Sequence, residues 1–232
     1  MTAEEKMYSH KRTARIVGAL FLISNIVFIL GAIVFVEPIL SAADYLTLAS
    51  ENRAQLVLGA LLEFSNGIAY LGIAVLMFPI FKHRFESMAL AYVGFRVIEF
   101  VMQTLSDLSP LSLLTLSEEF VRAGAPAASS FQTSGTLLLA ERYWAFQMVS
   151  ITLVLGALLF YTMLYKSKLI PRFISIWGLF GAIVVLVNAM MDMFGFPPGN
   201  LGVVMLLNEL FLGVWLIVKG FNPSAIVSES VT

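Results

Sequence analysis

The chain lacks several residue types on which enzyme active sites depend. It has 232 residues, no cysteine and two histidines. Without cysteine, disulfides, thiolate metal sites and cysteine nucleophiles are excluded. His10 and His83 lie among basic residues at the edges of apolar runs, as solvated flanking residues do, so we expect no metal site and no cofactor. No serine–histidine pair or glycine-rich phosphate loop is present within the apolar runs, which argues against nucleophilic catalysis by a triad and against nucleotide hydrolysis.

Charge is also scarce. Lys and Arg number 14 against 15 Asp and Glu, for a formal net charge of −1. This balance excludes nucleic acid as an expected partner, because nucleic-acid binding requires a surplus of Lys and Arg. Hydrophobic residues, by contrast, make up 59% of the chain, and the mean hydropathy is +0.89. These values are far above those of soluble domains and indicate an integral membrane protein whose main partner is the lipid bilayer.

Six apolar runs are long enough to cross hydrocarbon, which takes roughly 20 helical residues. They predict an all-α fold, a bundle of six transmembrane helices at about 14–36, 54–79, 87–108, 137–164, 172–194 and 201–218. The first run resembles a signal peptide, but its apolar part (16–36) is long enough to be retained as a span. We therefore expect an N-terminal tail at 1–13, a helical domain at 14–221 and a disordered tail at 222–232.

The basic residues that flank the spans predict their orientation. One side carries ten of them: Lys6, Lys11, Arg12, Arg15, Lys82, Arg84, Lys166, Lys168, Arg172 and Lys219. The other side carries three: Arg53, Arg122 and Arg142. By the positive-inside rule both termini are cytoplasmic, as in a multi-pass protein of the cell (inner, cytoplasmic) membrane.

The predicted outer side has two notable connections. Residues 41–52 suggest a short surface helix. In 111–123, leucines and phenylalanine lie opposite Glu118, Glu119 and Arg122, an amphipathic pattern expected at the membrane interface. That segment is either a lid over the outer mouth or a connector with no gating role. Residues 124–135, which are rich in small residues, are expected to form a flexible linker.

Two sequence features mark the expected ends of spans. Pro79 is expected to close the second span, because proline interrupts the hydrogen-bond ladder of a helix. Glu141–Arg142–Tyr143–Trp144 reads as an aromatic belt at headgroup level, at the outer start of the fourth span.

The chain is organised around a polar stripe on the third span. Arg96, Glu99, Gln103 and Asp107 are spaced by 3, 4 and 4 residues, so they fall within about 80° of arc on one helix face. Charged groups in lipid cost several kcal/mol each unless they face protein or water, which makes this stripe the default place for function. Arg96 keeps its proton and is expected to pair with Glu99, one turn away.

Other spans carry polar residues at similar depth. The predicted ligand-binding residues are Glu63, Asn66, Arg96, Glu99, Gln103, Gln147, Asn188, Asp192, Asn208 and Glu209. Asp107 and Asp192 are expected at the outer rim, above the others. Asn25, in the first span, is expected to supply either an interhelical hydrogen bond or a ligand contact.

Three acids (Glu63, Glu99 and Glu209) and one base (Arg96) are expected deep in the spans. Two negative charges are in excess if all four residues ionise. An isolated carboxylate is unfavourable in a low-dielectric interior. We therefore expect Glu63 or Glu209 to be protonated near neutral pH or to hold a cation.

Three motifs in order resemble one family. They are Gly94–Phe95–Arg96–Val97–Ile98–Glu99, then Ile170–Pro171–Arg172 followed by Trp177–Gly178–Leu179, then Asn208–Glu209–Leu210 leading to Trp215 and Phe221. Together, from about Arg12 to Phe221, they resemble the bacterial DUF4386 membrane proteins. The resemblance implies the six-span fold and carries no activity.

Three functions remain open at this point. The first is binding or transport of a small polar or cationic ligand, coupled to protons, through a pocket open to the outer side. The second is an enzyme that uses the buried carboxylates on a lipid. The third is a non-catalytic sensor or partner subunit, in which the buried Arg–Glu pair serves to fix helix register.

Overall fold

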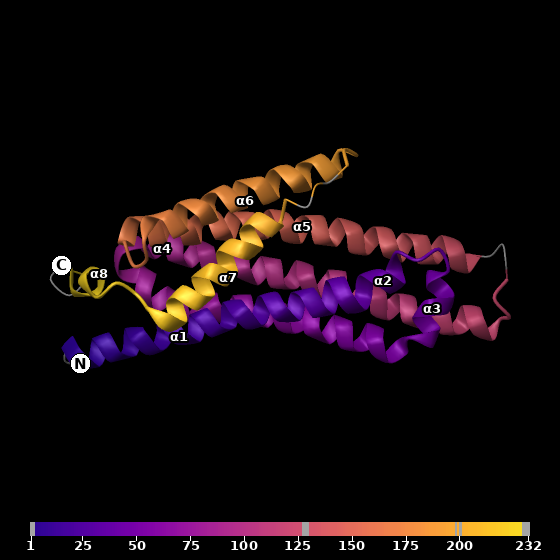
Figure 1. The fold of residues 1–232 in the computed structure, drawn as a ribbon. Coiled ribbons are helices and arrows are strands. Elements are labelled where there is room, and N and C mark those ends of the chain that lie inside the picture. The colour runs from indigo at the N-terminus through magenta and orange to yellow at the C-terminus, as the bar shows by residue number, and fades with distance from the viewer. Residues whose placement is uncertain (1–2, 127–129, 198, 200, 229–232) are drawn as a thin grey trace. The chain divides into compact units, whose positions relative to one another are not determined.

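The computed structural model describes residues 3–126, 130–197, 199 and 201–228. Every regular element in this part of the chain is a helix, which confirms the predicted all-α class (Figure 1). The elements are α1 (Ala3–Phe28), the π-helix η1 (Ile29–Val36), α2 (Glu37–Leu40), α3 (Tyr45–Glu51), α4 (Arg53–Arg122), α5 (Ser130–Ser167), α6 (Arg172–Met193), α7 (Val203–Val218) and α8 (Pro223–Ser228).

Four helical stretches of the described chain are long and apolar enough to cross a membrane. They are Tyr8–Leu40, Arg53–Arg122, Ser130–Ser167 and Arg172–Met193, and α7 is a shorter apolar helix. The chain therefore has the helices of a membrane protein. The long stretch α4 contains both the second and the third predicted span.

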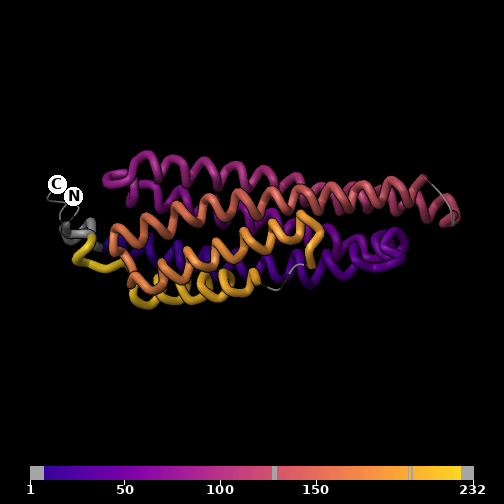
Figure 2. The backbone as a smooth tube through the Cα atoms, turned by 90° about the horizontal axis from the view of Figure 1, so that it is seen from above, coloured from indigo at the N-terminus to yellow at the C-terminus, as the bar shows by residue number. Residues whose placement is uncertain are grey.

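Helix α4 is not straight. Phe85 has non-helical dihedral angles (φ −138°, ψ 46°), and the backbone changes direction there (Figure 2). The sequence had predicted an end at Pro79, but the helix continues through Pro79 to the bend. Proline removes one backbone donor, and the residues around it still extend the helix.

The second arm of α4 also runs further than predicted. Residues 111–122 continue the helix instead of forming a separate connector. Leu113, Leu114 and Phe120 are 1%, 4% and 7% exposed, so the apolar face of this segment packs against protein. They form a core with residues of η1, α2, α3 and the start of α4.

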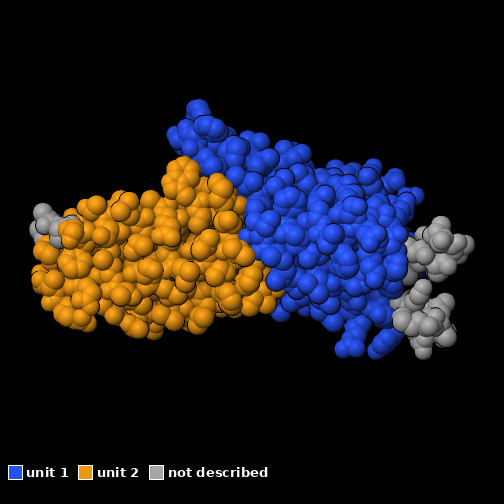
Figure 3. Space-filling view, turned by 180° about the vertical axis from the view of Figure 1, so that it is seen from behind, with its two compact units in different colours: residues 1–25, 69–99, 150–232 blue, residues 26–68, 100–149 orange. Residues whose placement is uncertain are grey.

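The chain divides into two compact units, drawn in different colours in Figure 3. Unit 1 comprises Met1–Asn25, Ala69–Glu99 and Ser150–Thr232; unit 2 comprises Ile26–Ile68 and Phe100–Val149. The boundaries fall inside α1, α4 and α5, so each of these helices contributes to both units.

Unit 1 is held together by large buried side chains and by close helix contacts at glycine. Phe21, Tyr92 and Phe160 are at most 1% exposed. A Cβ atom placed on Gly18 of α1 would lie 2.6 Å from the carbonyl oxygen of Gly213 on α7. Small residues allow such close approach of helices in membrane proteins.

Unit 2 also contains a close contact between helices at glycine. A Cβ atom on Gly31 of η1 would lie 2.8 Å from the carbonyl oxygen of Gly59 on α4. The predicted surface helix within 41–52 is present as α3, and its Leu46 is 4% exposed in the core of this unit. The hydroxyl group of Ser117 on α4 donates to the carbonyl oxygen of Leu46.

Two segments with predicted irregular structure are partly helical. Helix α8 covers Pro223–Ser228, inside the tail expected to be disordered, and residues 229–232 lie outside the described part. In the predicted linker 124–135, α5 already begins at Ser130, and residues 127–129 lie outside the described part.

Candidate functional site

The buried charged side chains of the described residues fall into two groups of contacts, one in each unit. The Glu209 group, in unit 1, contains Asn25, Tyr70, Arg96, Glu99 and Glu209. The Glu63 group, in unit 2, contains Glu63, Gln103, Ser106, Asp107 and Arg142. Every one of these ten residues is at most 9% exposed. The two groups are therefore interior features of their units.

Arg96 and Glu99 form a buried ion pair. One terminal nitrogen of Arg96, Nη1, donates to the two carboxylate oxygens of Glu99 at 2.9 and 2.7 Å. This confirms the pairing predicted from the spacing along α4. The guanidinium carbon also lies 4.7 Å from the ring centroid of Tyr70 and 5.5 Å from that of Tyr92, at distances typical of cation–π attraction.

A glycine on α5 makes room for this arginine. A Cβ atom on Gly156 would lie 3.4 Å from Nε of Arg96, so a larger side chain at this position would crowd the guanidinium group. The Nε atom itself is buried and has no acceptor among the described residues. The arginine thus retains one unused donor inside the unit.

Glu209 on α7 receives hydrogen bonds from two other helices. The hydroxyl group of Tyr70 (α4) and Nδ2 of Asn25 (α1), at 3.4 Å, both donate to its Oε2 atom. The hydrogen bond from Asn25 confirms one of the two roles predicted for it. Tyr70 contacts Arg96 with its ring and Glu209 with its hydroxyl group, so it joins the ion pair to the second carboxyl group.

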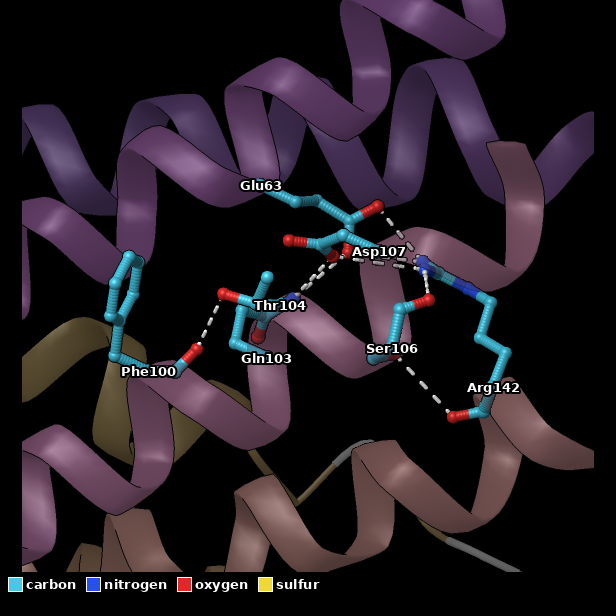
Figure 4. Close-up of polar contacts among 7 residues, drawn as sticks. All are labelled: Glu63, Phe100, Gln103, Thr104, Ser106, Asp107 and Arg142. Carbon is cyan, nitrogen blue, oxygen red and sulfur yellow. Dashed lines mark hydrogen bonds and ion pairs between the residues drawn. The ribbon is translucent and has the colours of Figure 1, made fainter. Parts of the chain in front are cut away.

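In unit 2, Arg142 is shared by two acids (Figure 4). Its Nη2 atom donates to both oxygens of Glu63 at 2.9 and 3.0 Å. Its Nη1 atom lies 4.0 Å from Oδ1 of Asp107 and donates to the carbonyl oxygen of Ser106 at 3.3 Å. Figure 4 shows both carboxyl groups facing the guanidinium group.

Gln103 connects the same two acids from the other side. Its Nε2 atom donates to Oδ1 of Asp107 at 2.7 Å and to Oε2 of Glu63 at 3.3 Å. The remaining oxygen of Asp107, Oδ2, is buried and has no donor among the described residues. The Glu63 group therefore contains an oxygen atom with unused capacity to accept a hydrogen bond or a cation.

The position of Arg142 corrects the sequence analysis. The sequence placed it in an exposed aromatic belt, yet it is 9% exposed, whereas Trp144 of the same motif is 49% exposed. Consecutive residues of a helix point to different faces, so a shared motif does not imply a shared environment. The signal in the sequence that could have placed Arg142 on the inner face was its spacing of seven, about two helical turns, from the apolar residue Val149.

Asp107 is also buried, at 4% exposure, within the Glu63 group. The count of buried charges among the described residues changes accordingly: four acids (Glu63, Glu99, Asp107 and Glu209) accompany two arginines. The excess of two negative charges is the same as predicted. The excess is now divided, because the described part of each unit holds two buried acids and one buried arginine.

Two further predicted residues are buried near these groups in sequence. Asn66, one turn after Glu63, is 8% exposed, and its Oδ1 atom has no donor among the described residues. Gln147 on α5 is 5% exposed. Both lie in unit 2.

The other predicted residues have local roles. Asn208 donates through Nδ2 to the carbonyl oxygen of Ile174 on α6 at 3.0 Å. Asn188 is half-buried, and its Oδ1 atom accepts from the backbone N–H of Gly199 at 2.9 Å, which fixes the turn after α6. Asp192 is half-buried at the end of α6, where its carbonyl oxygen accepts from Gly195.

The chemistry available in both groups is that of carboxyl groups with hydrogen-bond donors. Two carboxylates with one guanidinium carry one net negative charge when all are ionised. In a desolvated interior that charge is strongly unfavourable unless a proton or a cation balances it.

Comparison with known proteins identifies the family. Residues 16–220 match the family model described as "Domain of unknown function (DUF4386)". No curated protein and no solved structure matches the chain. Because the match covers most of the chain, the protein belongs to the DUF4386 family, as the resemblance in its motifs predicted.

Proposed function

We propose that this protein binds or transports a small polar or cationic ligand across the bacterial cell (inner) membrane, and that ligand binding is coupled to protonation of its buried carboxyl groups. The chain crosses the membrane six times with both termini in the cytoplasm. The two arms of α4 supply two of the spans and α7 the last. The family match, the apolar helices and the uneven distribution of basic residues support this topology.

One observation carries the functional proposal: in its described part, each unit buries two acids and one arginine. A protein that needed only a fixed interhelical contact would be served by a single balanced pair, and replacing such pairs by apolar residues is often neutral for stability. The additional acid in each group costs free energy unless it is protonated or holds a cation. Ionisable residues retained inside a membrane protein mark ion, proton or substrate pathways.

Within unit 1 the two acids have different partners. Glu99 is paired with Arg96, whereas Glu209 has a phenol and a carboxamide as its hydrogen-bond partners. Glu209 is therefore the group that exchanges a proton or cation. In unit 2, Asp107 has this role, because Arg142 lies against both oxygens of Glu63 and 4.0 Å from Asp107.

The proposal is tested by the effect of cationic ligands on thermal unfolding of the detergent-purified chain at a series of pH values. Sodium, potassium, choline and short primary amines serve as probes. We expect at least one probe to stabilise the protein more as pH rises, since protons and probe compete for the same carboxyl group. Glu209→Gln and Asp107→Asn, when combined, should keep the fold and abolish the pH dependence of stabilisation by the probe.

The matched control is Glu119→Gln, which neutralises an exposed acid on α4, the helix that carries Asp107. It should behave as the wild type. If no probe stabilises the wild type, and Glu209→Gln unfolds with the wild-type pH profile, the buried acids act as a scaffold and the proposed function is wrong.

A further inference from the structure

Unit 1 also contains a pocket that is lined by basic side chains. The pocket, of about 530 Å³, opens between the end of α5, the start of α6 and the end of α7. Its walls include Lys168, Arg172 and Lys219, together with Trp215 and Phe221. None of the ten residues of the Glu63 and Glu209 groups lines it.

The pocket is strongly cationic. Lys168 and Lys219 are exposed, and within the described chain neither they nor Arg172 forms an ion pair with an acid. The guanidinium of Arg172 lies over the ring of Tyr165, 5.0 Å from its centroid. Among the described residues that line the pocket there is no Asp or Glu. Three uncompensated positive charges around one cavity favour an anion.

The backbone that forms the pocket is fixed. Asn222 donates its backbone N–H to the carbonyl oxygen of Leu169 at 2.8 Å, which ties the chain after α7 to the α5–α6 turn. Leu169 and Ile170 are at most 2% exposed, and Phe221 is 5% exposed. The cationic side chains therefore extend from an ordered frame rather than from a loose tail.

An apolar surface continues from the pocket along α6 and α7. Phe173, next to Arg172, is 54% exposed, and Val218, next to Lys219, is 67% exposed. The rings of Phe173, Phe211 and Trp215 form a row in which neighbouring centroids are 5.9 and 6.3 Å apart. A cationic pocket that borders exposed apolar and aromatic side chains has the features of a lipid headgroup site.

We propose that this pocket binds the phosphate of an anionic phospholipid, with Lys168, Arg172 and Lys219 around the phosphate and the acyl chains along Phe173, Phe211 and Val218. The overall charge of −1 does not oppose this, because the three cations are concentrated at one place. The site is independent of the buried acids. Binding at this pocket depends on the negative charge of the lipid and not on the ligand proposed for the Glu209 group.

Native mass spectrometry of the full chain released from mixed micelles tests the proposal. The probes are phosphatidylglycerol, which is anionic, phosphatidylcholine, which has the same phosphate but no net charge, and inorganic phosphate. We expect the wild type to retain phosphatidylglycerol in preference to phosphatidylcholine. Each cation removed should weaken this binding about fivefold, and two about 25-fold.

The variants are Lys168→Asn and Lys219→Gln, separately and combined. Asparagine suits position 168 because Lys168 has a positive φ of 58°, which asparagine tolerates better than most residues. Lys166→Gln is the matched control: it removes an exposed charge two residues away, and Lys166 does not line the pocket. Arg172→Gln gives a second route if the double variant does not fold.

Each outcome decides the proposal. Selective loss of phosphatidylglycerol in the pocket variants, with Lys166→Gln unaffected, supports it. If inorganic phosphate displaces phosphatidylglycerol from the wild type and binds equally well without lipid, the ligand is a soluble phosphate and the proposed lipid site is overturned. Equal retention of both lipids, or equal weakening by Lys166→Gln, overturns it.

Discussion

At the residue scale, Arg142 is the side chain whose removal should affect the stability of unit 2 most. It is the sole described cation in contact with Glu63, and it lies next to Asp107 as well. Removing it leaves two acids buried without a counter-charge. The stability of unit 2 should therefore depend on this side chain far more than on exposed arginines nearby.

Arg142→Gln is expected to lower the free energy of unfolding by about 3–5 kcal/mol, the range found when one member of a buried ion pair is removed. Denaturant titration of the detergent-purified chain measures this. The control is Arg122→Gln, which breaks the exposed pair with Glu119 and should cost less than about 1 kcal/mol. Similar losses for both variants would show that Arg142 is not paired as described.

Tyr70 provides a second residue-scale test. Tyr70→Phe keeps the ring against Arg96 and removes the hydroxyl group that donates to Glu209. We expect a loss of about 1–3 kcal/mol in unfolding free energy, because a buried acceptor loses its donor. Combined with Glu209→Gln in a double-mutant cycle, the two effects should couple. Strict additivity would contradict the contact.

At the element scale, unit 1 depends on the close approach of α1 and α7. Gly18→Ala places a methyl group 2.6 Å from the carbonyl oxygen of Gly213, and overpacking of this kind costs about 1–3 kcal/mol. Gly94→Ala is the control: a Cβ there meets nothing within 4 Å, and alanine stabilises a helix by up to about 1 kcal/mol relative to glycine. The two variants should shift the unfolding temperature in opposite directions; a shift of the same sign would refute this packing.

The helices also show what apolar pattern can and cannot predict. The predicted spans 172–194 and 201–218 agree closely with α6 and α7, because turn residues bound both apolar runs. The same pattern missed the extent of α4 and α5. Hydropathy marks the part of a helix suited to lipid, whereas its ends are set by packing, as Leu113 and Phe120 illustrate in unit 2.

The buried polar residues were predictable in part, because several of them lie on the same helix. Arg96, Glu99, Gln103 and Asp107 lie on one helix, so their spacing gave their common face and the Arg96–Glu99 pair. Contacts between helices, such as Arg142 with Glu63, join residues 79 positions apart. Spacing along one helix carries no information on such pairs, which is why the grouping into two sets was not predicted.

At the scale of the whole molecule, the proposed topology can be tested directly because the chain has no cysteine. Single cysteines at Arg84 and Thr133, both exposed, should differ in reactivity toward a membrane-impermeant thiol reagent in intact cells. We expect Thr133→Cys to react at once and Arg84→Cys to react after lysis. Labelling of both, or the reverse order, would contradict the cytoplasmic placement of the turn at Phe85.

The described parts of the two units bury the same kinds of ionisable side chain. Each buries two acids and one arginine, and each adds a carboxamide donor: Asn25 in unit 1 and Gln103 in unit 2. The same imbalance occurs twice, so we expect a molecule without added cations to carry protons on its buried acids at neutral pH. This claim underlies the proposed function.

Infrared spectroscopy of the purified chain, in buffer free of inorganic cations, tests that claim most directly. A band from protonated carboxyl groups should persist at neutral pH, and Glu209→Gln and Asp107→Asn should each reduce it while Glu119→Gln leaves it unchanged. If every carboxyl group instead titrates below about pH 5, as solvated acids do, and the variants do not alter the band, the buried acids are fully ionised and the account is contradicted.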